Sequence, residues 1–217
     1  RDVERSRGLG DVYKRQMKKD IILSGVGGQG ILSIATVIGK AALDAGLSIK
    51  QAEVHGMSQR GGDVQSNLRI SSEPIHSDLI PYGSADLIVS LEPMEALRYV
   101  PYLSKEGWIV TNTNPFVNID NYPEMSEVES ELEDCGNVVA FNMDETAKSL
   151  MSPRSSNMVL LGAASPFIDL KAEEIEQAIA NLFSKKGVKI VESNIGAFKA
   201  GKKYTCLLYT SPSPRDL

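Results

Sequence analysis

Short apolar runs alternate with longer helical stretches along the chain. Asp20–Ser24 is a run typical of a buried strand, and Gln29–Ala45 is apolar on nearly all sides, which predicts a buried helix. Gly46 is a natural stop for that helix, and Ile49–Val54 predicts a second strand. The chain therefore opens with a β-α-β unit, whose two strands we expect to run parallel in a right-handed crossover.

The same patterns continue to the end of the domain. Val64–Ile70 places alternate residues on one face, as a half-exposed strand does. Further strands are predicted at Asp86–Ser90, Trp108–Thr111 and Asn137–Phe141. Helices are predicted at Pro93–Leu103, Met143–Met151, Asn157–Ala164 and Lys171–Lys185 (capped by Asp169), with an acidic surface helix at Glu124–Asp134 and an irregular connection at Asn114–Pro123. This alternation predicts a single α/β domain, a three-layer α/β/α sandwich on a Rossmann-like, mostly parallel sheet.

The two ends of the chain share an unusual relationship. Arg7–Gln16 can be encoded by a DNA segment whose reverse complement, read one base along, encodes Cys206–Arg215. One cassette in opposite orientations explains both stretches, and it resembles a translated sequencing-library adaptor. We therefore expect residues 1–16 and 206–217 to be foreign tails around one domain at residues 17–205.

Charge and cysteine content exclude several classes of function. The chain has 217 residues and a formal net charge of −5, and the domain without its tails is more acidic still. An acidic domain without a basic stripe argues against nucleic acid and membrane surfaces as partners, and no apolar run reaches the length of a membrane span. Cys135 is the single cysteine outside the tails, which suits a cytoplasmic protein and excludes a zinc or iron–sulfur site held by cysteines of this domain alone.

A glycine-rich loop, GVGGQG, joins the first strand to the first helix. Gly25, Gly27 and Gly30 match the dinucleotide-binding pattern G-x-G-x-x-G, and Glu53 ends the second strand roughly where a ribose-binding carboxylate lies. A P-loop is not predicted, because Ile-Leu follows the loop where Lys and Ser/Thr are needed. Three roles stay open: a tight turn without a ligand, a dinucleotide site, and a site for another phosphate or carboxylate at the helix start.

A second motif, Ala52–Val64, leaves the carboxyl end of the second strand, the sheet edge at which ligands bind in open parallel sheets. Arg60 can bind an anion through two hydrogen bonds, and His55 can transfer a proton near neutral pH. Either side chain alone fits an ordinary structural role, but together beside a glycine loop they indicate a site. The candidate catalytic residue is His55, and the candidate residues for binding an anion or a partner subunit are Gly25, Gly27, Gly28, Gln29, Gly30, Glu53, Gln59, Arg60, Gly61 and Gly62.

Three stretches together resemble a known family: GVGGQGILSIATVIGKAAL, EVHGMSQRGGDVQSNLRI and LEPMEALRYVPYL. They are similar to the small (beta) subunit of indolepyruvate:ferredoxin oxidoreductase and, more broadly, to the gamma domain of 2-oxoacid:ferredoxin oxidoreductases. The resemblance covers Met17 to about Gly201. The stretch EVHGMSQRGG favours the indolepyruvate branch over the 2-oxoglutarate and pyruvate branches.

This resemblance implies oxidative decarboxylation of aryl-2-oxoacids to acyl-CoA, with electrons passed to ferredoxin. It places thiamine diphosphate, Mg²⁺ and [4Fe-4S] clusters on a large partner subunit in a heterodimer or heterotetramer, with coenzyme A as a substrate. The chain itself then holds no tightly bound cofactor and is inactive alone. Gly25–Gly30 and Arg60 are expected to receive a coenzyme A phosphate or a substrate carboxylate, and His55 to assist protonation. The alternatives are a free-standing dinucleotide-dependent oxidoreductase and a non-catalytic assembly module.

Overall fold

The computed structural model describes residues 17–55, 61–117 and 119–210, and these residues contain one six-stranded sheet. Its strands stand in the order β2-β3-β1-β4-β5-β6. β1, β4, β5 and β6 run parallel, whereas β3 is antiparallel to both β1 and β2. The strand bounds are β1 (Lys18–Val26), β2 (Ser48–His55), β3 (Asp63–Ser71), β4 (Ala85–Ser90), β5 (Leu103–Asn112) and β6 (Val138–Phe141).

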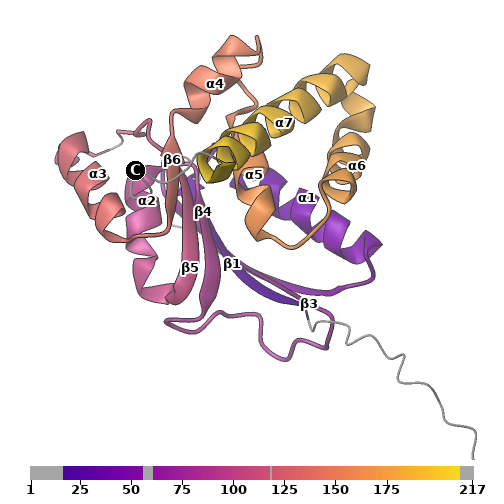
Figure 1. Cartoon of the computed structure of the whole chain (residues 1–217), viewed down its shortest axis with the longest axis horizontal. Helices are drawn as coiled ribbons and strands as arrows, with labels where there is room; N and C mark the ends of the chain where they lie inside the picture. The colour runs from indigo at the N-terminus through magenta and orange to yellow at the C-terminus, as the bar shows by residue number, and fades with distance from the viewer. Residues whose placement is uncertain (1–16, 56–60, 118, 211–217) are drawn as a thin grey trace, which may run out of the picture.

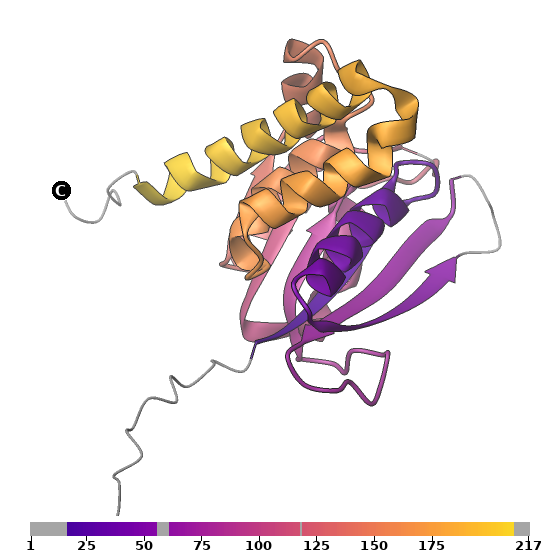
Figure 2. The same cartoon turned by 90° about the vertical axis from the view of Figure 1, so that its right-hand side faces the viewer.

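Helices cover both faces of this sheet, which confirms the predicted α/β/α sandwich (Figures 1 and 2). Alternate residues of β1 supply the two cores: Ile21 and Leu23 pack with the α1–α5–α6–α7 layer, and Ile22 packs with the α2–α3 layer. The helix bounds are α1 (Ile31–Asp44), α2 (Pro93–Arg98), α3 (Met125–Asp134), α4 (Met143–Ser149), α5 (Ser156–Ala164), α6 (Ala172–Phe183) and α7 (Val188–Thr210). Three 3₁₀ turns are η1 (Val100–Tyr102), η2 (Ser165–Phe167) and η3 (Ser184–Lys186).

The first two strands, β1 and β2, are not neighbours in the sheet, as they would be in a simple β-α-β unit. β1 and β2 do run in the same direction, as predicted, but β3 lies between them and pairs with both. The predicted strand at Val64–Ile70 is therefore an interior strand, and Leu68 and Ile70 are fully buried under α1. The edge position on this side of the sheet belongs to β2.

The last helix, α7, has no counterpart among the predicted elements. It packs along α5, and two glycines make this approach close. A Cβ atom on Gly162 would lie 1.9 Å from the carbonyl oxygen of Phe198, and one on Gly201 would lie 1.9 Å from that of Val159. α7 continues to Thr210, so it includes residues that we expect to belong to a foreign tail.

Two predicted helix boundaries are wrong. The helix expected at Pro93–Leu103 ends at Arg98, because the chain tightens into η1 and then enters β5 at Leu103. Asp169 does not cap α6: it has a positive φ of 61° and forms an ion pair with Lys19 at 2.9 Å. The α6 N-cap is Lys171, whose N–H donates to the Glu174 carboxylate at 3.0 Å.

Candidate functional site

The glycine loop lies at the carboxyl end of β1 and closes against the start of α5. Gly30 is the N-cap of α1 and has a φ of 91°, a conformation that suits glycine. The side-chain amide of Asn157 donates to the Gly30 carbonyl at 3.3 Å, and a Cβ atom on Gly30 would lie 2.7 Å from that amide nitrogen. Gly30 is therefore required by its conformation and by this contact, whether or not a ligand binds.

Gln29 holds the loop from inside. Its Oε1 accepts a hydrogen bond from the N–H of Val26 at 2.7 Å, and its Nε2 donates to the carbonyl of Leu91, just beyond β4, at 3.4 Å. A Cβ atom on Gly25 would lie 2.9 Å from the same Oε1. The structure thus gives Gly25 and Gln29 a role in shaping the loop, in addition to any role toward an anion.

Gly28 differs from these neighbours. Its φ is 102°, yet no atom lies within 4 Å of the position that a Cβ would take. The space beside it is part of a cavity of about 330 Å³, called here the glycine-loop cavity. Its wall comes from the ends of several strands and from the α4–α5 connection: Gly28, Gln29, Leu91, Asn112, Asp144, Pro153, Arg154, Ser156 and Asn157. A ligand can therefore approach the loop backbone at Gly28.

The second motif reaches the glycine loop through its two glycines. The N–H of Gly27 donates to the carbonyl of Gly62 at 2.8 Å, and Gly61 takes a positive φ of 79° in the turn before β3. His55 ends β2 opposite Val64, and its side chain lies outside what the structure describes. Gln59 and Arg60 also lie outside the described residues, so their proposed roles stay predictions.

Glu53 lies on β2 opposite Ser66 of β3. Because β3 separates β2 from β1, Glu53 is two strands away from the strand that carries the glycine loop, or about 10 Å at the usual strand spacing. In the dinucleotide fold the acidic residue ends the strand next to the glycine loop's strand. The glycine pattern is present here, but the strand order that gives it a ribose-binding carboxylate is not.

Asp144 organises the far wall of the glycine-loop cavity, and the sequence reasoning missed it. Its carboxylate accepts hydrogen bonds from Ser156 at 2.6 Å and from Asn112 and Asn114 at 2.9 Å each. Burial acts to raise the pKa of Asp144, but the hydrogen bonds from these three side chains outweigh it and hold the pKa below its usual value. An ionised Asp144 therefore ties β5 to the starts of α4 and α5.

The sequence does indicate part of the cavity wall that contains Asp144. Asn112 ends β5, and Asp144 closely follows β6, so both lie at the carboxyl edge of parallel strands, where ligand sites form. Asn157 and Arg154 carry no such local signal, because they meet the glycine loop only through tertiary packing. The contact between Asn157 and Gly30 joins residues that are 127 positions apart.

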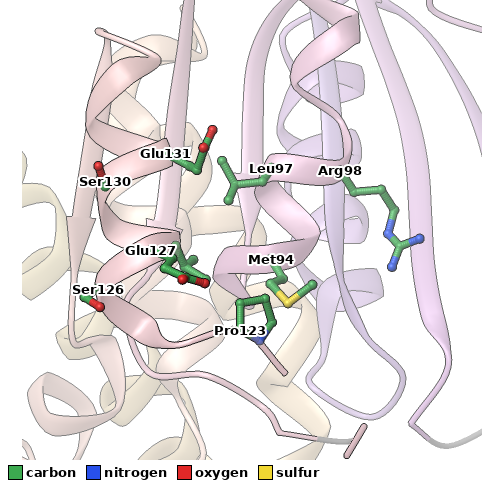
Figure 3. A pocket seen from close by; sticks show the side chains of 9 residues that line it. Met94, Leu97, Arg98, Pro123, Ser126, Glu127, Ser130 and Glu131 are labelled. Carbon is green, nitrogen blue, oxygen red and sulfur yellow. The ribbon is translucent and has the colours of Figure 1, made fainter. Parts of the chain in front are cut away.

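A separate cavity of about 940 Å³ lies on the other face of the sheet, between α2 and α3 (Figure 3). Its apolar floor includes Met94 and Leu97, and Glu127 and Glu131 stand on its α3 side. Arg98 also lines it, with its guanidinium paired to Glu95 at 2.9 Å. Glu127 and Glu131 give the α3 side of this cavity an acidic character.

Neither a metal centre nor a membrane span is found in the described part of the chain. No three His, Cys, Asp or Glu side chains there converge as metal ligands. The chain has two cysteines: Cys135 follows α3 and is half-buried, and Cys206 is exposed on α7. An iron–sulfur cluster needs about four thiolates, so these residues do not fit one. Among the described helices, none combines the length and the apolar composition needed to cross a bilayer.

Comparisons with known proteins all point to one enzyme family. A family model described as pyruvate ferredoxin/flavodoxin oxidoreductase matches residues 20–204. Indolepyruvate oxidoreductase subunit IorB of Thermococcus kodakarensis is 38% identical over 194 residues, covering 85% of this chain and 94% of that protein. 2-Oxoglutarate synthase subunit KorC of Methanocaldococcus jannaschii is 30% identical over 191 residues, covering 86% of this chain and 93% of that protein.

A solved structure has the same fold. It is the 2-oxoglutarate:ferredoxin oxidoreductase from Magnetococcus marinus with 2-oxoglutarate, coenzyme A and succinyl-CoA bound, which matches with a TM-score of 0.70 and 25% identity. The match covers 90% of this chain and 32% of that chain. The whole domain described above therefore corresponds to about a third of a larger enzyme chain.

Proposed function

The chain belongs to the pyruvate ferredoxin/flavodoxin oxidoreductase family, and from this premise we propose that it is the small, non-cofactor-carrying subunit of an indolepyruvate (arylpyruvate):ferredoxin oxidoreductase. The reaction is oxidative decarboxylation of an aryl-2-oxoacid to its acyl-CoA with reduction of ferredoxin. Thiamine diphosphate, Mg²⁺ and [4Fe-4S] clusters then belong to a large partner subunit, in a heterodimer or heterotetramer. The low cysteine content supports a cytoplasmic complex.

One observation carries this proposal: the chain is 38% identical to a protein named as an indolepyruvate oxidoreductase subunit, over nearly the full length of that protein. The 2-oxoglutarate synthase subunit is less similar, at 30% identity, which favours the indolepyruvate branch. The cysteine count agrees, because two cysteines cannot ligate the clusters that low-potential electron transfer needs. We therefore assign the redox groups to a partner subunit.

The chain's own contribution is to shape a ligand site at the edge of the sheet. The glycine-loop cavity offers open backbone at Gly28, the N-terminus of α1 and the Arg154 side chain, all of which favour an anion. The Asp144 carboxylate in the same wall opposes them, and its charge is already held by hydrogen bonds from Ser156, Asn112 and Asn114. We assign this edge to a coenzyme A phosphate or to the substrate carboxylate, with Gly61 and Gly62 in the adjoining turn. Gln59, Arg60 and the proton-transfer role of His55 belong to the same proposal.

Reconstitution tests this function directly. The chain is purified alone and together with a candidate large subunit, and indolepyruvate-dependent reduction of ferredoxin is measured with coenzyme A present. Turnover is expected only when both subunits are mixed, with phenylpyruvate and 2-oxoglutarate as comparison substrates. Turnover by the chain alone, or the absence of a complex between the two subunits, would overturn the proposal. A stronger response to 2-oxoglutarate than to indolepyruvate would assign the chain to a different branch.

A further inference from the structure

The cavity of about 940 Å³ between α2 and α3, called here the α2–α3 groove, has no part in the site assigned above. Met94 and Leu97 of α2, both half-buried, form its apolar floor, and Pro123 lies beside Met94 (Figure 3). Glu127 and Glu131 stand about one turn apart on the side of α3 that faces α2. The groove therefore combines an apolar floor with an acidic wall.

The acidic wall is not neutralised within the described part of the chain. Neither Glu127 nor Glu131 forms an ion pair with a lysine or arginine there. Arg98 also lines the groove, but its guanidinium is already held by the Glu95 carboxylate, through Nε at 2.9 Å and Nη2 at 3.1 Å. A group that satisfies both the wall and the floor must therefore be cationic as well as apolar.

α3 carries its charge at a cost to its own stability. The stretch from Glu124 to Asp134 has six carboxylates and no lysine or arginine. Glu127 and Glu131 form an i,i+4 pair of like charges, which costs about 0.2–0.5 kcal/mol. The last turn of α3 has no basic residue to interact with the negative end of the helix. A cationic partner on this wall would relieve the repulsion, so charge that is unfavourable in the isolated chain becomes favourable in a complex.

The shape of the groove favours a helix as its occupant. An amphipathic helix laid into an apolar groove is a common mode of recognition, and here two helices form the walls. α3 has 10 residues, a length of about 15 Å, so it can face about three turns of a bound helix. Ser126 and Ser130 also line the groove, and their short side chains leave room for a helix to approach.

A second copy of this chain is a poorer occupant of the α2–α3 groove. A two-fold dimer across the groove would bring two acidic walls together, and like charges facing each other in an interface are unfavourable. Charge therefore favours a different protein, one whose docking surface is basic.

We propose that the α2–α3 groove docks a basic amphipathic helix of the large partner subunit. Apolar side chains of that helix lie on Met94 and Leu97, and its lysine or arginine side chains pair with Glu127 and Glu131. This inference rests on the proposed function and adds to it the surface and chemistry of subunit contact. The domain fills nearly all of the IorB subunit of Thermococcus kodakarensis but only 32% of the Magnetococcus marinus enzyme chain. Where the domain is a separate subunit, a surface of this kind is needed to hold its partner.

The test measures the dissociation constant between the full chain and the candidate large subunit used for reconstitution. The double variant Glu127→Gln/Glu131→Gln is expected to raise this constant by about tenfold at low salt, the usual effect of losing charged hydrogen bonds. The effect should shrink as the ionic strength rises. At saturating amounts of the variant, ferredoxin reduction per complex should equal that of the parent chain, because the groove lies outside the proposed ligand site.

The matched control is Glu129→Gln/Glu133→Gln in the same helix. It removes the same charge and another i,i+4 pair of like charges, but neither residue lines the groove, so its dissociation constant should stay within about twofold of the parent value. Both double variants should unfold at the same or a higher urea concentration than the parent chain, since each relieves one repulsion. Met94→Gln tests the floor and is expected to weaken the complex at low and high salt alike.

Three results would overturn the docking proposal: an unchanged dissociation constant in Glu127→Gln/Glu131→Gln, equal weakening in the two double variants, or a homodimer of the parent chain that dissociates in Glu127→Gln/Glu131→Gln. The last result would identify a second copy as the occupant. In each case the proposed function stands as long as the parent chain and the large subunit restore turnover. Failure of the parent chain itself to form a complex overturns both proposals.

Discussion

The close contact between α5 and α7 allows the effect of one substitution on the free energy of unfolding to be predicted from the structure. In Gly201→Ala the new Cβ atom would lie 1.9 Å from the Val159 carbonyl oxygen and 2.9 Å from the Ala163 nitrogen. Both are backbone atoms, so no side chain can rotate away and the two helices must shift apart. Overpacking typically costs about 1–3 kcal/mol, and a contact with rigid backbone belongs at the upper end of that range.

The matched control is Gly196→Ala, in the same helix. No atom lies within 4 Å of the new Cβ position there, so this substitution adds only helix propensity, a stabilisation of about 0.5–1 kcal/mol. The propensity gain is common to both variants. The difference between their free energies of unfolding therefore isolates the overpacking cost, which we expect to be about 3 kcal/mol.

Urea unfolding, monitored by circular dichroism, measures both free energies, with equal m-values required for the comparison. Gly201→Ala is expected to be clearly less stable than the parent chain and Gly196→Ala slightly more stable. If the two variants differ by less than about 0.5 kcal/mol, the usual size of a neutral surface change, the close approach of the two helices is refuted.

Three further predictions concern the glycine loop and two carboxylates, those of Asp144 and Glu92. Asp144→Asn is expected to destabilise the fold by about 1–3 kcal/mol at pH 7. Because the folded pKa of Asp144 is lowered, the stabilisation by its carboxylate is present above about pH 4 and is lost as the pH falls. The difference in unfolding free energy between the parent chain and the variant should therefore be smaller at about pH 3 than at about pH 7. Tyr122→Phe leaves the Glu92 carboxylate, 2% exposed, without its phenol donor, and a loss of about 1–3 kcal/mol in urea unfolding is expected; an unchanged midpoint would contradict this hydrogen bond. Gly30→Ala should lower the thermal midpoint more than Gly28→Ala, because both positions have a positive φ but only Gly30 also meets a neighbouring side chain.

Local patterns predicted most of the sheet and its layers. Buried strands such as Asp20–Ser24 and the amphipathic or apolar helices are properties of short segments, and these predictions are confirmed within a few residues. The place of β3 between β1 and β2 was not predicted, because strand order depends on pairing between distant segments. α7 was missed for a related reason: its two glycines lower local helix propensity, and one of them is needed for the contact with α5.

The candidate site was predicted in part. The sequence identified the glycine loop, and the hydrogen bond between Gly27 and Gly62 confirms that the two predicted motifs meet. It did not identify Asp144 or Asn157, which reach the loop from the far end of the chain. The expected roles of His55, Gln59 and Arg60 stay predictions.

The contact between Gly30 and Asn157 also has an evolutionary consequence. The shape of the loop depends on two positions that lie far apart in the chain: a side chain at position 30 must adopt a positive φ and also needs a smaller residue at position 157. Relatives with a side chain at position 30 should carry a smaller residue at position 157, and relatives that keep asparagine there should keep glycine. Because Asn157 also lines the glycine-loop cavity, such a paired substitution would alter the cavity wall as well as the loop.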